Sequence, residues 1–117
     1  MAALGDGGAL MGASDLETLV RLGLPMVVVV YNDDAYGAEV HHFGPEGFPL
    51  DTVRFPPVDL TSIAAGFGTT LTVRTVADLA PAEHWLHGPR DTPLLIDGDP
   101  RPGRLVAGGG LPQPLMR

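Results

Sequence analysis

Two short groups of residues in this 117-residue chain have side chains that could hold a cation and an anion together. The first is Gly5-Asp6-Gly7-Gly8, where an aspartate stands among glycines that let backbone amides approach an anion. The second is Asn32-Asp33-Asp34, which directly follows a run rich in valine. Because a carboxylate repels phosphate unless a cation lies between them, Asp6 suggests a divalent metal that bridges carboxylate and phosphate.

Neither of the two familiar phosphate loops matches the glycine-rich segment. A Walker loop needs lysine and then serine or threonine after its last glycine, whereas Gly12 is followed by alanine and serine. A dinucleotide-binding loop needs its third glycine where Leu10 stands. A P-loop-like nucleotide binder is therefore disfavoured. The simpler alternative is that Asp6 and Asp33 are turn residues, because aspartate is common in turns and caps.

The segments that must position these groups predict a parallel sheet. Residues 26–31 form a continuous, mostly β-branched run without alternation, which is typical of a central strand covered on both faces. Strands and helices alternate after it, which indicates an α/β fold with a partial doubly wound parallel sheet and helices on both faces. Strands are predicted at 26–31, 70–74 and 93–97, helices at 15–22, 60–67 and 75–86, and a long loop at 37–58.

Capping residues indicate where the predicted helices begin. Ser14 and Glu17 have the spacing of a capping box, so we assign them a structural role and no chemistry. Asp59 can cap the second helix, and Thr75 begins the third, which Pro81 interrupts or restarts.

The predicted sheet brings the two candidate groups together. The carboxyl ends of neighbouring parallel strands meet at one edge, where open α/β sheets bind their ligands. Asp6 and Asp33 could then reach one ion at ~2.0–2.1 Å, with phosphate oxygens and water completing its shell. The residue types and their places thus predict a metal and phosphate site.

Taken together, the two groups resemble the cofactor motif of thiamine diphosphate-dependent enzymes. The chain has GDG at residues 5–7, ND at 32–33 after 24 intervening residues, and then AYG. The stretch GASDLETLVRLGLPMVVVVYNDDAYG, residues 12–37, is similar to acetolactate synthase, benzoylformate decarboxylase and related 2-oxo acid enzymes. A weaker similarity extends to residue 98. The resemblance implies the thiamine diphosphate-binding fold, with residues 1–98 as an incomplete C-terminal diphosphate-binding domain.

The resemblance also implies roles for individual residues. The side chains of Asp6 and Asp33 and the backbone carbonyl of Ala35 would ligate Mg²⁺. The second ligand is more often asparagine in that family, so Asp33 adds negative charge to the pattern. The amides of Gly7 and Gly8 would contact the diphosphate. The cofactor-binding residues that the motif implies are Asp6, Gly7, Gly8, Asn32, Asp33, Tyr36 and Gly37.

The activity implied by the resemblance is decarboxylation of a 2-oxo acid and transfer or release of the aldehyde unit. An acetolactate synthase-like enzyme is the first hypothesis, and a benzoylformate- or indolepyruvate-type decarboxylase is the alternative. In that family an activating glutamate lies on a separate pyrimidine-binding domain, usually of a partner subunit, and no residue here matches it. We therefore expect a homo-oligomer or a partner subunit that supplies this domain, and an isolated chain that is inactive.

The beginning of the chain also favours a fragment. Only four residues precede Gly5, fewer than the strand that such a loop normally leaves. A truncated gene, a misplaced start codon and a split subunit all remain open, as does a remnant that keeps the loop without catalysis.

Composition and charge exclude several classes of function. The chain has 14 acidic and 7 basic residues, a net charge of −7, which disfavours nucleic acid as a partner. It contains no cysteine, which excludes a disulfide framework or a thiolate metal site and favours the cytoplasm. Its longest apolar run, residues 26–30, is far shorter than the ~20 residues needed to cross a bilayer.

No catalytic residue is assigned from the sequence. Glu39, His41 and His42 follow the motif, in the segment that leads toward substrate in the family, and each could be a general acid or base or a plain solvated side chain. His84 and His87 are expected at the surface. Residues 99–117 are rich in glycine and proline and are predicted to be an irregular tail, not a second phosphate loop.

Overall fold

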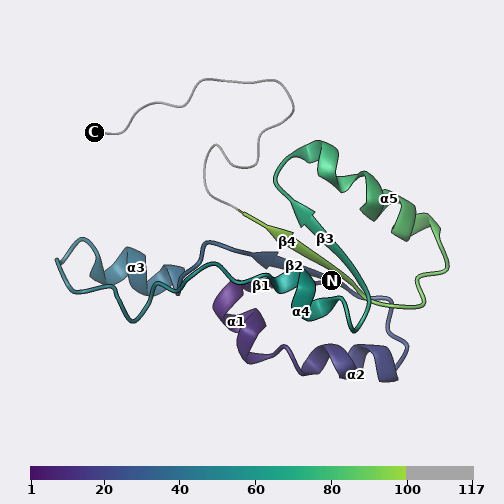
Figure 1. Ribbon diagram of the computed structural model, residues 1–117, viewed down its shortest axis with the longest axis horizontal. Coiled ribbons are helices and arrows are strands. Elements are labelled where there is room, and N and C mark those ends of the chain that lie inside the picture. The colour runs from purple at the N-terminus through teal and green to yellow at the C-terminus, as the bar shows by residue number, and fades with distance from the viewer. Residues whose placement is uncertain (100–117) are drawn as a thin grey trace.

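The computed structural model describes residues 1–99, and a four-stranded parallel sheet lies at its centre (Figure 1). The strand order is β1-β2-β4-β3, so β2 and β4 are central and β1 and β3 are the edges. Val30 pairs with Asp97, and Asp97 pairs in turn with Thr72 on the other side. The strands are β1 (Ala2–Gly5), β2 (Val27–Tyr31), β3 (Thr69–Val73) and β4 (Leu94–Gly98).

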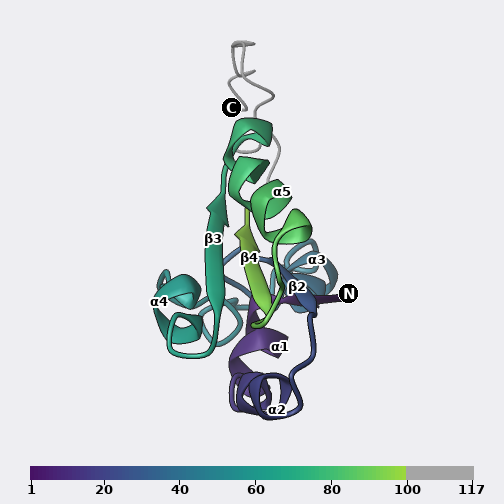
Figure 2. The same ribbon diagram turned by 90° about the vertical axis from the view of Figure 1, so that its right-hand side faces the viewer.

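Helices cover both faces of this sheet, as Figure 2 shows edge-on. On one face, Leu60 and Ala64 of α4 pack with Val28 and Val30, and apolar residues of α1 and α2 join them. On the other face, Trp85 of α5 packs against β4. The helices are α1 (Asp6–Met11), α2 (Asp15–Arg21), α3 (Gly37–Phe43), α4 (Leu60–Ala64) and α5 (Ala80–His87), with a 3₁₀ turn, η1, at Val76–Leu79.

The predicted α/β architecture is confirmed. The valine-rich run forms the central strand β2, and the two later strands lie within one residue of their predicted bounds. Asp59 caps α4, because its carboxylate accepts from the Ser62 amide at 2.9 Å. Thr75 and Asp78 form a capping box, and Pro81 stands at the start of α5, where proline is tolerated.

Three predictions about strands and helices are wrong. The five residues before Asp6 are not too few for a strand, since residues 2–5 form β1, which pairs with β2. Residues 6–11 form helix α1 although two glycines follow Asp6, and α3 lies in the predicted loop at 37–58. Helix α3 buries none of its residues, so the apolar period that would have indicated a helix is absent.

The predicted capping box at Ser14 does not form. Ser14 already has a helical backbone, with φ −64° and ψ −23°, and its side chain makes no capping hydrogen bond. A true N-cap is extended, so that its oxygen can turn back to the following amides. Glu17 pairs instead with Arg21, one turn along α2, at 3.0 Å.

The arrangement leaves the carboxyl edge of the sheet open on one side. Helix α3 projects away from the sheet beyond the end of β2 (Figure 1). No helix within residues 1–99 is long and apolar enough to span a membrane. The predicted tail at 99–117 falls, apart from Asp99, outside the described residues.

Candidate functional site

Asp6 joins the two candidate groups. It follows β1 directly as the first residue of α1, and only 3% of its surface is exposed. Its Oδ1 accepts from the amide of Gly7 at 2.9 Å, and its Oδ2 accepts from the amide of Ala35 at 3.3 Å. Because β1 and β2 are neighbours in parallel, their carboxyl ends bring these residues together, as the sequence predicts.

The surroundings of Asp6 disfavour its charge. Burial raises the pKa of its carboxyl above the usual value, and the negative charge of Asp33 raises it further, against the lowering effect of the amide hydrogen bonds. A cation between the two carboxylates would oppose both raising effects, because opposite charge favours the ionised form.

A cavity of about 320 Å³ lies at this point of the sheet edge. Its lining contains three acidic side chains, those of Asp6, Asp33 and Glu39, and no basic one. An anionic ligand therefore needs a cation here. The lining residues are Gly5, Asp6, Gly7, Gly8, Tyr31, Asp33, Ala35, Tyr36, Gly37, Ala38 and Glu39.

The donor set fits a magnesium ion that shares its shell with phosphate. Mg²⁺ is usually bound through one or two carboxylates, with phosphate oxygens and water completing its octahedron. Within residues 1–99, no group of three or more histidines and acids is arranged as a complete cage. Two carboxylates and a nearby backbone carbonyl therefore match the partial protein shell that this ion takes.

Two glycines of the site leave no room for a side chain. A Cβ on Gly37 would lie 2.6 Å from Oδ2 of Asp33, and a Cβ on Gly7 would overlap the ring of Tyr36. Glycine at both positions therefore allows the second motif to approach the first.

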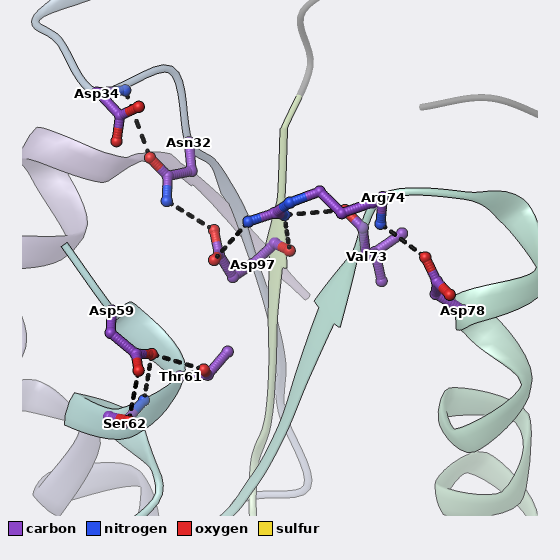
Figure 3. Close-up of polar contacts among 9 residues, drawn as sticks. All are labelled: Asn32, Asp34, Asp59, Thr61, Ser62, Val73, Arg74, Asp78 and Asp97. Carbon is purple, nitrogen blue, oxygen red and sulfur yellow. Dashed lines mark hydrogen bonds and ion pairs between the residues drawn. The ribbon is translucent and has the colours of Figure 1, made fainter. Parts of the chain in front are cut away.

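The residues implied by the motif separate into two groups. Asp6, Asp33 and Ala35 line the cavity, as do the other predicted cofactor-binding residues except Asn32. Asn32 is 8% exposed, and its side chain bonds Asp97 and the Asp34 amide instead (Figure 3). Of the three residues left open, Glu39 lines the cavity, whereas His41 and His42 do not and lie in the last turn of α3.

Asp97 and Arg74 are polar neighbours of the site that the motif did not indicate. Asp97 is 4% exposed and lies in β4, and Arg74 directly follows β3. The signal was present, because the apolar run PLLID ends in an aspartate on a strand predicted to be covered. A carboxylate there needs a partner inside the fold.

Comparison with known protein families gives a match over residues 1–97, to the C-terminal TPP-binding domain of thiamine pyrophosphate enzymes. The chain belongs to this family. Thiamine pyrophosphate is thiamine diphosphate, so the match agrees with the resemblance of the GDG and ND motifs. The family assigns the chain to the cofactor-binding part of these enzymes.

Two relatives come from Bacillus subtilis strain 168. Acetolactate synthase is 38% identical over 66 residues, which is 56% of this chain and 12% of that protein. The protein YdaP, whose name describes it as thiamine pyrophosphate-containing, is 31% identical over 115 residues, which is 92% of this chain and 20% of that protein. The chain thus spans at most a fifth of the relatives' length.

Solved structures of family members share the fold. The thiamine diphosphate-dependent 4-hydroxybenzoylformate decarboxylase of Rhodococcus jostii RHA1 superposes with a TM-score of 0.71 at 27% identity, over 83% of this chain and 19% of that one. Benzoylformate decarboxylase from Polynucleobacter necessarius has a TM-score of 0.70 at 20% identity, over the same shares. At the latter identity the likeness concerns the fold alone.

Proposed function

We propose that the chain binds thiamine diphosphate through Mg²⁺, held by the side chains of Asp6 and Asp33 and the backbone carbonyl of Ala35. One observation carries this assignment: the two carboxylates share a cavity whose lining has no basic side chain. A diphosphate can approach such a cavity only together with a cation.

The other lining residues orient the cofactor. The motif implies that the amides of Gly7 and Gly8 contact the diphosphate. The Gly7 amide also donates to Oδ1 of Asp6 at 2.9 Å, so the two contacts would share one N–H. Tyr36 and Gly37 line the same cavity. The bound cofactor supplies the carbanion chemistry, and this chain contributes its binding and orientation.

For the reaction, we propose an acetolactate synthase-like enzyme that decarboxylates a 2-oxo acid and joins the product to a second one. The 38% identity to acetolactate synthase supports this choice. The activating glutamate would come from a pyrimidine-binding domain, in a homo-oligomer or on a partner subunit. By itself, the chain is then a binding domain without catalysis.

A benzoylformate-type decarboxylase is the second candidate. It is favoured by the 27% identity and TM-score of 0.71 to the 4-hydroxybenzoylformate decarboxylase. The two reactions can be distinguished by their substrates. The rate at which pyruvate is consumed is compared with the rate for benzoylformate, after the partner that carries the glutamate has been added.

Calorimetric titration of the folded chain with thiamine diphosphate, with and without Mg²⁺, tests the binding assignment. We expect binding only with the metal, and Asp33→Ala should abolish it. The matched control is Asp51→Ala, which removes the same charge from an exposed site outside the cavity lining. Binding that is independent of Mg²⁺, or equal in Asp33→Ala and wild type, contradicts the assignment.

A further inference from the structure

The buried carboxylate of Asp97 is not explained by ligand binding, because Asp97 does not line the cavity. It lies in β4 at the centre of the sheet and is paired in register with Val30 of β2. A carboxylate 4% exposed in this place costs free energy unless its oxygens are hydrogen-bonded. Its partners therefore indicate what it does.

Both oxygens of Asp97 are used, and by different strands (Figure 3). Oδ1 accepts from Nδ2 of Asn32 at 2.9 Å, and Oδ2 pairs with Nη2 of Arg74 at 3.4 Å. Arg74 is itself fixed, because its Nη1 donates to the carbonyl oxygens of Val73 and Asp97, both at 3.0 Å. The network connects the carboxyl ends of β3, β4 and β2.

Asp97 also determines which way the Asn32 amide points. An ionised carboxylate only accepts hydrogen bonds, so the NH₂ group of Asn32 must face it. The side-chain carbonyl oxygen of Asn32 then faces the residues that follow it, and it accepts from the amide of Asp34 at 3.4 Å.

That turn uses a left-handed residue. Asp34 has φ 58°, a region that aspartate adopts more readily than most residues other than glycine. A residue in this region keeps its conformation best where its surroundings fix it. Beyond it, the amide of Ala35 reaches Asp6, and Asp33 faces the same cavity. Asn32 thus fixes the turn that carries two of the three proposed metal ligands.

We propose that Asp97, oriented by Arg74, is a positioning residue that acts through Asn32 to hold residues 33–35 in place for the cation. The inference rests on the proposed function and assigns a role to two residues outside the cofactor motif. Groups that hydrogen-bond the ligands of a metal typically contribute about 10–100-fold to its affinity.

The test measures the Mg²⁺ concentration that half-saturates binding at fixed thiamine diphosphate. Asp97→Ala should raise it by up to about tenfold, the low end for groups that hydrogen-bond a metal's ligands directly, because Asp97 acts one step further out through Asn32. Asp97→Asn should stay closer to wild type, because its amide oxygen can still accept from Asn32. In the Asn32→Ala background, Asp97→Ala should add little, since its partner is already gone.

Asp78→Asn is the matched control. Asp78 accepts from the backbone amide of Arg74, on the side away from Asn32 (Figure 3), and from the amide of Thr75. It should lower thermal stability without moving the Mg²⁺ half-saturation point.

A readout without cofactor separates this inference from the proposed function. In ¹⁵N–¹H spectra of the metal-free chain, the amide resonances of Asp34 and Ala35 should shift in Asp97→Ala and stay in place in Asp78→Asn. If the Asp34 and Ala35 resonances do not move in a folded Asp97→Ala variant, the inference is wrong. If they move but the wild-type chain never binds thiamine diphosphate with Mg²⁺, only the proposed function is wrong. If Asp97→Ala does not fold, Arg74→Ala replaces it, because the Arg74 side chain is half-exposed and its loss disturbs the fold less. We then expect smaller shifts of the same two amide resonances, in the same direction.

Discussion

Two aspartates begin helices on the same face of the sheet and have opposite electrostatic characters. Asp59 caps α4 in solvent, where its carboxylate accepts from the Ser62 amide and the hydroxyls of Thr61 and Ser62. These bonds lower its pKa to about 2. Asp6 begins α1 and also accepts two backbone amides, yet burial raises its pKa. Asp59 accepts from two hydroxyls that Asp6 lacks, whereas Asp6 is buried and close to the charge of Asp33, and both differences separate the two pKa values.

The comparison separates a structural carboxylate from one that we propose binds a cation. Ionised Asp59 stabilises the fold, because the folded state holds its charge better than the unfolded chain does. Ionised Asp6 costs the fold stability, because its amide hydrogen bonds only partly offset burial and the charge of Asp33, and a bound cation would offset more of that cost. A residue that is unfavourable for folding and yet central to a cavity is a strong candidate for function.

Removing each carboxylate should have the largest and most contrasting effects. Asp6→Ala should weaken Mg²⁺-dependent binding of thiamine diphosphate by more than the roughly 100-fold typical of indirect changes around a metal. Asp59→Ala should lower the melting temperature and leave the affinity unchanged. Calorimetric titration and thermal unfolding of both variants measure this, and equal affinity losses would remove the distinction.

Crowding beside the second ligand should have the next largest effect. In Gly37→Ala, the new Cβ would displace the Asp33 carboxylate, which can swing aside at little cost to folding. We expect the Mg²⁺ half-saturation concentration to rise about tenfold with nearly unchanged stability. Gly66→Ala, just beyond α4 with nothing within 4 Å of its Cβ, is the control that should change neither.

The pH dependence of stability should differ in sign between the two aspartates. Because the pKa of Asp59 is lowered to about 2, its contribution is present above pH 3.8 and lost as the pH falls toward 2. Asp59→Asn should therefore flatten this acid loss. Because the pKa of Asp6 is raised, Asp6→Asn should stabilise the metal-free chain at neutral pH, with the gain shrinking as the pH falls to 3.8 and below. Thermal unfolding in chelator between about pH 2.5 and pH 7 covers the expected loss for Asp59 below pH 3.8 and the expected gain for Asp6 above it, and parallel curves for the two variants would contradict this view.

A substitution at the start of a third helix, α2, should have the smallest effect on stability. Ser14 precedes α2 without a capping bond, so Ser14→Ala should change the free energy of unfolding by no more than about 0.5 kcal/mol. Urea denaturation measures it. A loss near the ~1 kcal/mol usual for an N-cap would mean that Ser14 caps α2 in solution after all.

Signals spread over many residues made the fold predictable. The valine-rich run, the Asp59 cap and the helix start at Thr75 each indicated an element correctly, because burial and helix starts leave a local pattern. The α1 helix was missed because glycines disfavour helices locally, whereas here Asp6 and the packing of Leu10 against the core hold it in place. Propensity is a weak prior that such contacts override.

The positions of the candidate site residues were predictable where two sequence motifs lie close together in the fold. The prediction was incomplete where a side chain's hydrogen-bond partner is far away in the sequence. Asp6, Asp33 and Ala35 were expected together, and the structure places all three at one cavity. The link from Asn32 to Asp97 spans 65 positions of the chain, and no local spacing encodes it. Only the register of β2 against β4 brings them into contact.

The strand order also has a consequence for the time course of folding. Strand β4 is the last of the four in sequence, yet it lies between β2 and β3. During synthesis β2 must wait for residues 94–98 before its inner edge is paired, and parallel pairings of such separation close slowly. The turn after β2 therefore gains its proposed anchor last, and a nascent chain completes the candidate cofactor cavity only when nearly all of residues 1–99 have left the ribosome.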